Sequence, residues 1–208
     1  MPEAERTRSE QETAEAADPP PPPVDAGEEI ACRRSLRELG VEYEEMEPID
    51  GEGTCGAASP VRVSGLGSGI DLTPTATLNC RTAEALARWA QEVVVPAAER
   101  HLDAAPTTFV NAADYVCRTR NNRPGAKLSE HATANAIDIA GIAMAEGEPV
   151  PILARSVEHA RERAFQRAIR RGACEHFTTV IGPGTNAAHA THFHFDLAKR
   201  RGGHRLCE

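Results

Sequence analysis

The sequence SEHATANAIDIAGI, residues 129–142, places one carboxylate, that of Asp138, inside an apolar run. A short, continuous apolar run is typical of a buried strand. A carboxylate inside such a strand is costly unless it is paired, hydrogen-bonded or bound to a cation. Asp138 is therefore a candidate site residue, and His131 precedes it by seven residues. A structural aspartate that meets a backbone amide or an arginine would satisfy the same rule.

A second stretch, HATHFHFDL over residues 189–197, contains three of the eight histidines of the chain. Side chains alternate between the two faces of a strand, so His192, His194 and Asp196 are predicted to share one face. The opposite face, toward the core, would carry Phe193, Phe195 and Leu197. Histidines two residues apart lie roughly 6.6 Å apart along a strand, which lets both imidazoles approach one ion. With His189 nearby, this spacing favours a metal-related site.

The two stretches together predict a catalytic zinc site. Two imidazoles and one carboxylate leave a fourth tetrahedral position for water, which is typical of catalytic rather than structural zinc. Zinc would lower the pKa of that water toward ~7 and polarise a carbonyl group. Calcium prefers ligand sets made only of oxygen atoms and would not select these side chains. The expected cofactor is therefore Zn²⁺.

The hydrophobic periodicity predicts an α+β fold. Helices are expected over residues 29–39, 79–101 and 156–173, and Pro96 should kink the second helix or begin a new one. Short strands are expected over residues 41–46, 61–63, 70–72, 107–116, 136–142, 177–181 and 193–197. These elements follow no repeating βαβ order, which favours the α+β class.

Composition separates a tail from one domain. The chain has 208 residues and a net charge of −8, which argues against nucleic acid as a partner. It contains no stretch of 18 apolar residues, so no membrane span is predicted. Residues 1–30 hold nine acidic and two basic side chains and include the run Pro19–Pro23. We predict a disordered, acidic, Pro-rich tail over residues 1–28 and a single domain over residues 29–208.

The cysteines indicate disulfides. Six are present, all outside the tail and none in a CxxC pair, which excludes a zinc ribbon: Cys32, Cys55, Cys80, Cys117, Cys174 and Cys207. An even, scattered set favours three disulfides over six reduced thiols, and hence a periplasmic or extracellular location. Residues 1–30 nevertheless show no apolar segment of the kind found in signal peptides.

Six cysteines allow 15 connectivities, and the sequence alone does not select one. Cys174–Cys207 is the first expectation, because both flank the segment from Phe177 to Leu197 that holds the histidines. The pairs Cys32–Cys55 and Cys80–Cys117 would then follow, because their members are neighbours among the cysteines of the chain.

The spacing of these residues resembles a known group of enzymes. The element Ser-x-His-x6-Asp at residues 129–138, followed by His-x-His at residues 192–194, resembles the D-Ala-D-Ala carboxypeptidase/hedgehog-type zinc peptidases. With His189 included, the spacing is most similar to the penicillin-insensitive murein endopeptidase branch. Over residues 30–208 the chain is similar to the bacterial extensin-like C-terminal domain family. The matching segments are residues 80–83 with Trp89, 115–118, 128–138, 173–177, 182–184 and 192–198, and Cys207.

The resemblance implies a fold and a role for each site residue. It implies an antiparallel sheet with flanking helices, hedgehog/DD-peptidase-like and braced by disulfides. It assigns the zinc ligands as His131, Asp138 and His194. It places His192, and then His189, on the open side of the metal as the base or a hydrogen-bond donor. Arg118 would hold a substrate carboxylate or the developing oxyanion.

Two departures from the peptidases affect the mechanism. Ala134 stands where the peptidases usually have glycine, so the backbone approach there would differ. The Glu-x-x-His element that supplies their base is absent, so the base would be His192, His189 or Glu130, in that order.

Three functions follow from these patterns. The first is an exported zinc-dependent hydrolase acting on peptide bonds of peptidoglycan. The second is a non-catalytic wall-binding or structural domain that keeps the metal-site fold. The third is a cytosolic zinc-storage protein, which the scattered cysteines disfavour.

Overall fold

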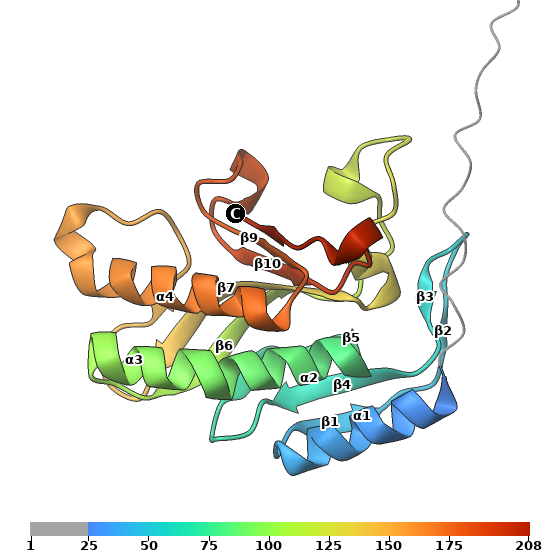
Figure 1. Cartoon of the computed structure of the whole chain (residues 1–208), viewed down its shortest axis with the longest axis horizontal. Helices are drawn as coiled ribbons and strands as arrows, with labels where there is room; N and C mark the ends of the chain where they lie inside the picture. Colours follow the sequence, from blue (N-terminus) through green and yellow to red (C-terminus); the bar gives the residue numbers. More distant parts are fainter. Residues whose placement is uncertain (1–24) are drawn as a thin grey trace, which may run out of the picture.

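A computed structural model describes residues 25–208 (Figure 1). The disorder predicted for residues 1–28 therefore falls mostly on residues outside the described part. The helices are α1 (Ala26–Glu38), α2 (Cys80–Trp89), α3 (Val95–Leu102) and α4 (Ala160–His176). The strands are β1 (Glu42–Glu45), β2 (Ile49–Asp50), β3 (Gly56–Ala57), β4 (Pro60–Gly65), β5 (Asp71–Asn79), β6 (Pro106–Ala113), β7 (Ala136–Met144), β8 (Val150–Pro151), β9 (Thr179–Ile181), β10 (Phe193–Asp196) and β11 (Leu206–Cys207).

One large sheet organises the fold, and the α+β class is confirmed. Nine strands form it in the order β1-β4-β5-β6-β7-β10-β9-β11, with β8 paired to β7; β2 and β3 form a separate hairpin. The helices α2, α3 and α4 lie along one face of this sheet (Figure 1). The opposite face of β7 and β10 is therefore left for the candidate site.

The resemblance implied an antiparallel sheet, but the observed sheet is mixed. β5 pairs with β6 in parallel through residues 71–73 and 108–110, and β11 pairs with β9 in parallel. The chain between β5 and β6 is occupied by α2 and α3, and a long helical connection of this kind returns the chain in the same direction. The remaining pairings in the sheet are antiparallel.

The core is centred on Trp89, at the end of α2. Its ring contacts Phe109 of β6 and Phe195 of β10, with centroids 5.4 and 4.8 Å away. Its indole N–H donates to the carbonyl of Ile169 in α4 at 2.9 Å, so one buried side chain joins two strands and two helices. Phe193 and Phe195 are both buried, which confirms that this side of the strand faces the core.

The long predicted helix over residues 79–101 is divided. A π-helical turn, Ala90–Val94, joins α2 to α3, and the proline lies in the first turn of α3. Pro96 has no N–H to donate to the preceding turn, so a new segment begins there. The first helix begins at Ala26, three residues before its predicted start.

Three disulfides are present, as predicted, but only one predicted pair is correct. Cys174–Cys207 joins α4 to β11. The other two are Cys32–Cys80 and Cys55–Cys117, so the predicted pairs Cys32–Cys55 and Cys80–Cys117 were wrong. Helix packing accounts for the Cys32–Cys80 pair, because α1 lies against α2 and brings Cys32 close to Cys80 at the start of α2. In the described residues, no helix is long and apolar enough to cross a membrane.

Candidate metal centre

Three predicted ligands converge at the junction of β7 and β10. The register places His194 of β10 directly opposite Asp138 of β7. His131 lies in a short 3-10 helix, Glu130–Thr133, that precedes β7. Ala134 then adopts a left-handed conformation with φ of +54°, which turns the chain into β7 and returns His131 over Asp138. This conformation favours glycine, because a side chain crowds the backbone at positive φ.

The three ligand atoms fit a small tetrahedral cation. His131 Nε2 lies 3.2 Å from His194 Nδ1 and 3.3 Å from Asp138 Oδ1, and the last two atoms are 2.9 Å apart. Zinc bound to nitrogen and oxygen at about 2.0–2.1 Å would separate tetrahedral ligands by roughly 3.3–3.4 Å. All three side chains are largely buried. These three residues could therefore hold a metal ion.

Each histidine is oriented by a partner at its other ring nitrogen. His131 Nδ1 lies 2.6 Å from the backbone carbonyl of Asp114, and His194 Nε2 lies 3.0 Å from Asp196 Oδ2. Hydrogen bonds of this kind fix the tautomer and leave the opposite nitrogen free to bind a metal. The Asp196 carboxylate also accepts from Thr179 Oγ1 and from the N–H of Ala198.

The sequence did not identify these two partners. Strand alternation places Asp196 on the same face as His194 but does not indicate a role for it. Asp114 acts here through its backbone carbonyl, which no side-chain pattern can reveal. A search for acidic residues two positions from a predicted ligand on the same strand face would have found Asp196.

The electrostatics of the cluster place a proton where a cation would bind. Burial alone would raise the pKa of Asp138, but hydrogen bonds from His131 and His194 outweigh it and hold that pKa well below its usual range. Burial alone would lower the pKa of His194, but its bonds to Asp138 and Asp196 raise it to about 9. Without a metal, His194 is therefore an imidazolium between two carboxylates at neutral pH.

His192 and His189 line the exposed side of the cluster. His192 Nε2 lies 3.6 Å from Asp138 Oδ2. The ring of His189 lies 5.3 Å from that of His192 and 5.8 Å from that of His194. His189 Nδ1 is 2.8 Å from the side-chain oxygen of Asn186, so Asn186 engages Nδ1 and not Nε2. Burial lowers the pKa of both His189 and His192.

The structure separates the two remaining candidates. Arg118 is half-buried, and its positive charge is one of the influences that lower the pKa of His189 and of His192. Glu130 instead accepts a hydrogen bond from Asn135 Nδ2 at 2.6 Å and lies 3.7 Å from Arg120. Both Glu130 oxygens are thus engaged outside the cluster, which makes Glu130 the weakest of the three predicted bases.

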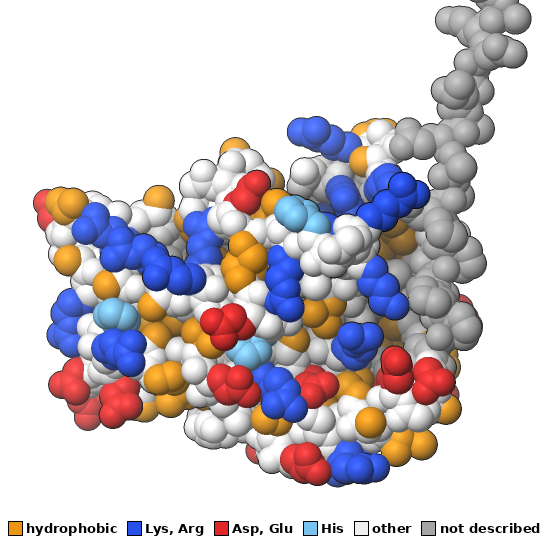
Figure 2. All heavy atoms as spheres, in the orientation of Figure 1, with side chains coloured by type: hydrophobic (Ala, Val, Ile, Leu, Met, Phe, Trp, Pro, Cys, Tyr) orange, Lys and Arg blue, Asp and Glu red, His pale blue; other side chains and the backbone are white. Residues whose placement is uncertain are grey.

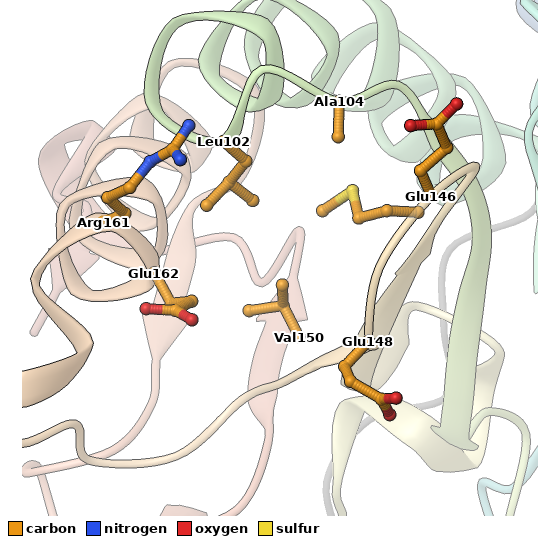
Figure 3. Close-up of a pocket in the computed structure, with 8 residues that line it drawn as sticks. Leu102, Ala104, Glu146, Glu148, Val150, Arg161 and Glu162 are labelled. Carbon is orange, nitrogen blue, oxygen red and sulfur yellow. The ribbon is translucent and has the colours of Figure 1, made fainter.

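A cavity of about 180 Å³ lies elsewhere in the fold (Figure 3). Its lining includes the apolar side chains of Leu102, Met144 and Val150 and charged side chains such as Glu146 and Arg161. Met144 is six residues from Asp138 along β7, or about 20 Å at 3.3 Å per residue. The cavity is therefore separate from the histidine cluster, and no histidine or cysteine lines it.

Comparison with known proteins gives a family. The sequence model of the family described as extensin-like protein C-terminus matches residues 30–208. No curated protein and no solved structure matches the chain.

Proposed function

We propose that this chain, which belongs to the extensin-like protein C-terminus family, is an exported zinc-dependent hydrolase that acts on peptide bonds of peptidoglycan. One observation carries the proposal. His131 Nε2, Asp138 Oδ1 and His194 Nδ1 form a triangle with edges of 2.9–3.3 Å, close to the spacing of tetrahedral zinc ligands, and two further histidines lie on its exposed side. A structural site would close the fourth position with another protein ligand.

The zinc ion and the surrounding side chains would have different roles in the reaction. Zinc held by these three residues would polarise a peptide carbonyl and lower the pKa of a water molecule. His192 is the first candidate for general base, because its Nε2 lies beside Asp138 at the cluster. His189 is the second, and Asn186 fixes the orientation of its ring. Arg118 would hold a carboxylate of the substrate or stabilise the developing oxyanion.

The location and the substrate rest on different observations. Three disulfides favour an oxidising compartment such as the periplasm or the cell exterior. The peptidoglycan substrate and a hedgehog/DD-peptidase-like fold rest on the resemblance of residues 129–138 and 189–194 to the murein peptidases.

A second candidate function is a non-catalytic wall-binding domain that keeps the metal centre. The glutamate base of the peptidases has no counterpart in this chain, and the observed position of Glu130 does not replace it. A domain that binds wall peptides needs the ligands and Arg118 but no base.

Digestion of purified muropeptides tests the first function against the second. We expect zinc-loaded wild-type protein to release new peptide ends, with loss of that activity in His192→Ala. His204→Ala is a matched control, because His204 is exposed and lies outside the cluster. Zinc-loaded protein that cleaves no muropeptide between pH 5 and 9 would reject the hydrolase and favour the binding domain.

A further inference from the structure

The hairpin that leads into His131 is strongly cationic. We call residues 118–128 the basic hairpin. Ser129 N donates to the Arg118 carbonyl at 3.0 Å and Arg120 N to the Lys127 carbonyl at 2.9 Å, which closes the hairpin. It projects beyond the sheet as the yellow-green loop in Figure 1. It contains four basic side chains and no acidic one: Arg118, Arg120, Arg123 and Lys127.

These charges are mostly uncompensated. Within residues 25–208, only Arg120 among the four has a carboxylate within 4 Å, at 3.7 Å from Glu130. Arg123 and Lys127 are exposed. Figure 2 shows Lys and Arg side chains gathered where the hairpin projects. A chain with a net charge of −8 therefore carries a local positive surface at this point.

The hairpin is fixed directly beside the metal centre. Its first end follows Cys117, which is bonded to Cys55, and Val116 N donates to the His131 carbonyl at 3.2 Å. Its second end runs through Ser129 into the 3-10 helix that carries His131. A molecule bound to the hairpin would therefore lie next to His131, Asp138 and His194.

We propose that the basic hairpin is a binding arm for a carboxylate-bearing polymer, which it holds beside the metal centre. Its identification with the substrate rests on the proposed function, whereas the binding itself does not. Guanidinium and ammonium groups spaced along a projecting hairpin suit a chain of carboxylates. A nucleic acid fits less well, because residues 118–128 contain no aromatic side chain for base stacking.

The test is the affinity for fluorescent poly-L-glutamate at low ionic strength. The test variant, Arg123→Glu with Lys127→Glu, reverses two charges on the hairpin. Arg163→Glu with Arg167→Glu is the matched control, because it makes the same change in net charge at two exposed positions on α4. We expect about a 10-fold or greater loss of affinity in the hairpin variant and less than about 2-fold in the control.

Equal losses in the two variants, or no loss in the hairpin variant, would overturn the proposal. Tighter binding of single-stranded DNA than of poly-L-glutamate would also overturn it, in favour of a nucleic acid. Zinc content and binding after chelation separate this result from the proposed function. Binding that survives chelation, with unchanged zinc content in the hairpin variant, supports an arm that acts independently of the metal. Binding lost on chelation would place the polymer on the metal instead and reject the arm.

Discussion

Asp196→Asn should weaken metal binding although Asp196 contacts no ion directly. Its Oδ1 side accepts from both Thr179 Oγ1 and Ala198 N, while Oδ2 faces His194 Nε2 at 3.0 Å. In the amide, the oxygen must stay with those two donors, so the NH₂ group would face His194. Two donors would then oppose one another unless His194 moves its proton to Nδ1, the atom that lies 2.9 Å from Asp138.

The magnitude follows from such partners in other metal sites. Removing the carboxylate behind a ligating histidine typically costs 10–100-fold in affinity, or about 1.4–2.7 kcal/mol. We expect the upper part of this range, because the amide both removes the negative charge and opposes the required tautomer. Competition against a chromophoric zinc chelator at pH 7.5 measures the change.

Asp71→Asn is the matched control, because Asp71 is exposed at the start of β5 and the substitution removes the same charge. Circular dichroism must first show that both variants are folded. A folded Asp196→Asn protein with the zinc affinity of the wild type would refute the reasoning, since it would show that the contact with His194 does not determine which nitrogen binds.

Four further predictions concern the site and its surroundings. Zinc affinity, measured by chelator competition, should rise about tenfold per pH unit from pH 6.5 and level off near 9, because the ion must displace the His194 proton; a flat profile would contradict it. The second prediction concerns the stability of the metal-free protein. The raised pKa of His194 stabilises the fold fully at pH values below about 6.5, and this contribution is lost as the pH rises through about 9. The low pKa of Asp138 stabilises the metal-free fold at pH values above about 3.8. Urea unfolding should therefore show the highest metal-free stability between about pH 3.8 and pH 6.5. His192→Ala should retain zinc and lower kcat by about 10²–10⁴-fold in a muropeptide assay, and loss of its zinc would make His192 a ligand. Ala134→Gly should lower the free energy of unfolding in urea by under about 1 kcal/mol, because relief of backbone strain at φ +54° offsets the loss of the buried methyl group. Ala132→Gly should cost more, because Ala132 is equally buried but does not have a positive φ.

Local patterns of apolar residues predicted the strands of the site well. Phe193 and Phe195 face the core, so the histidine that alternates with them lies on the opposite face. The continuous apolar run around Asp138 is a central strand, β7. The first prediction depends on the two-residue repeat of a strand and the second on a continuous apolar run, and the sequence displays both patterns directly.

Features set by packing between distant segments could not be predicted. Chain neighbours suggested Cys32–Cys55, whereas the packing of α1 on α2 selects Cys80 as the partner. The parallel pairing of β5 and β6 depends on the path of α2 and α3 between them. The Asp114 carbonyl reaches His131 through the backbone course after β6, on which side-chain chemistry gives no information.

The metal content of the purified protein tests the central claim most directly. Elemental analysis after controlled loading and dialysis should find about one zinc per chain in the wild type and in His204→Ala. The zinc should be absent from His131→Ala, Asp138→Ala and His194→Ala, because each removes one corner of the ligand triangle. A folded wild-type protein that retains no transition metal, or ligand variants that retain zinc at the wild-type ratio, would contradict the account.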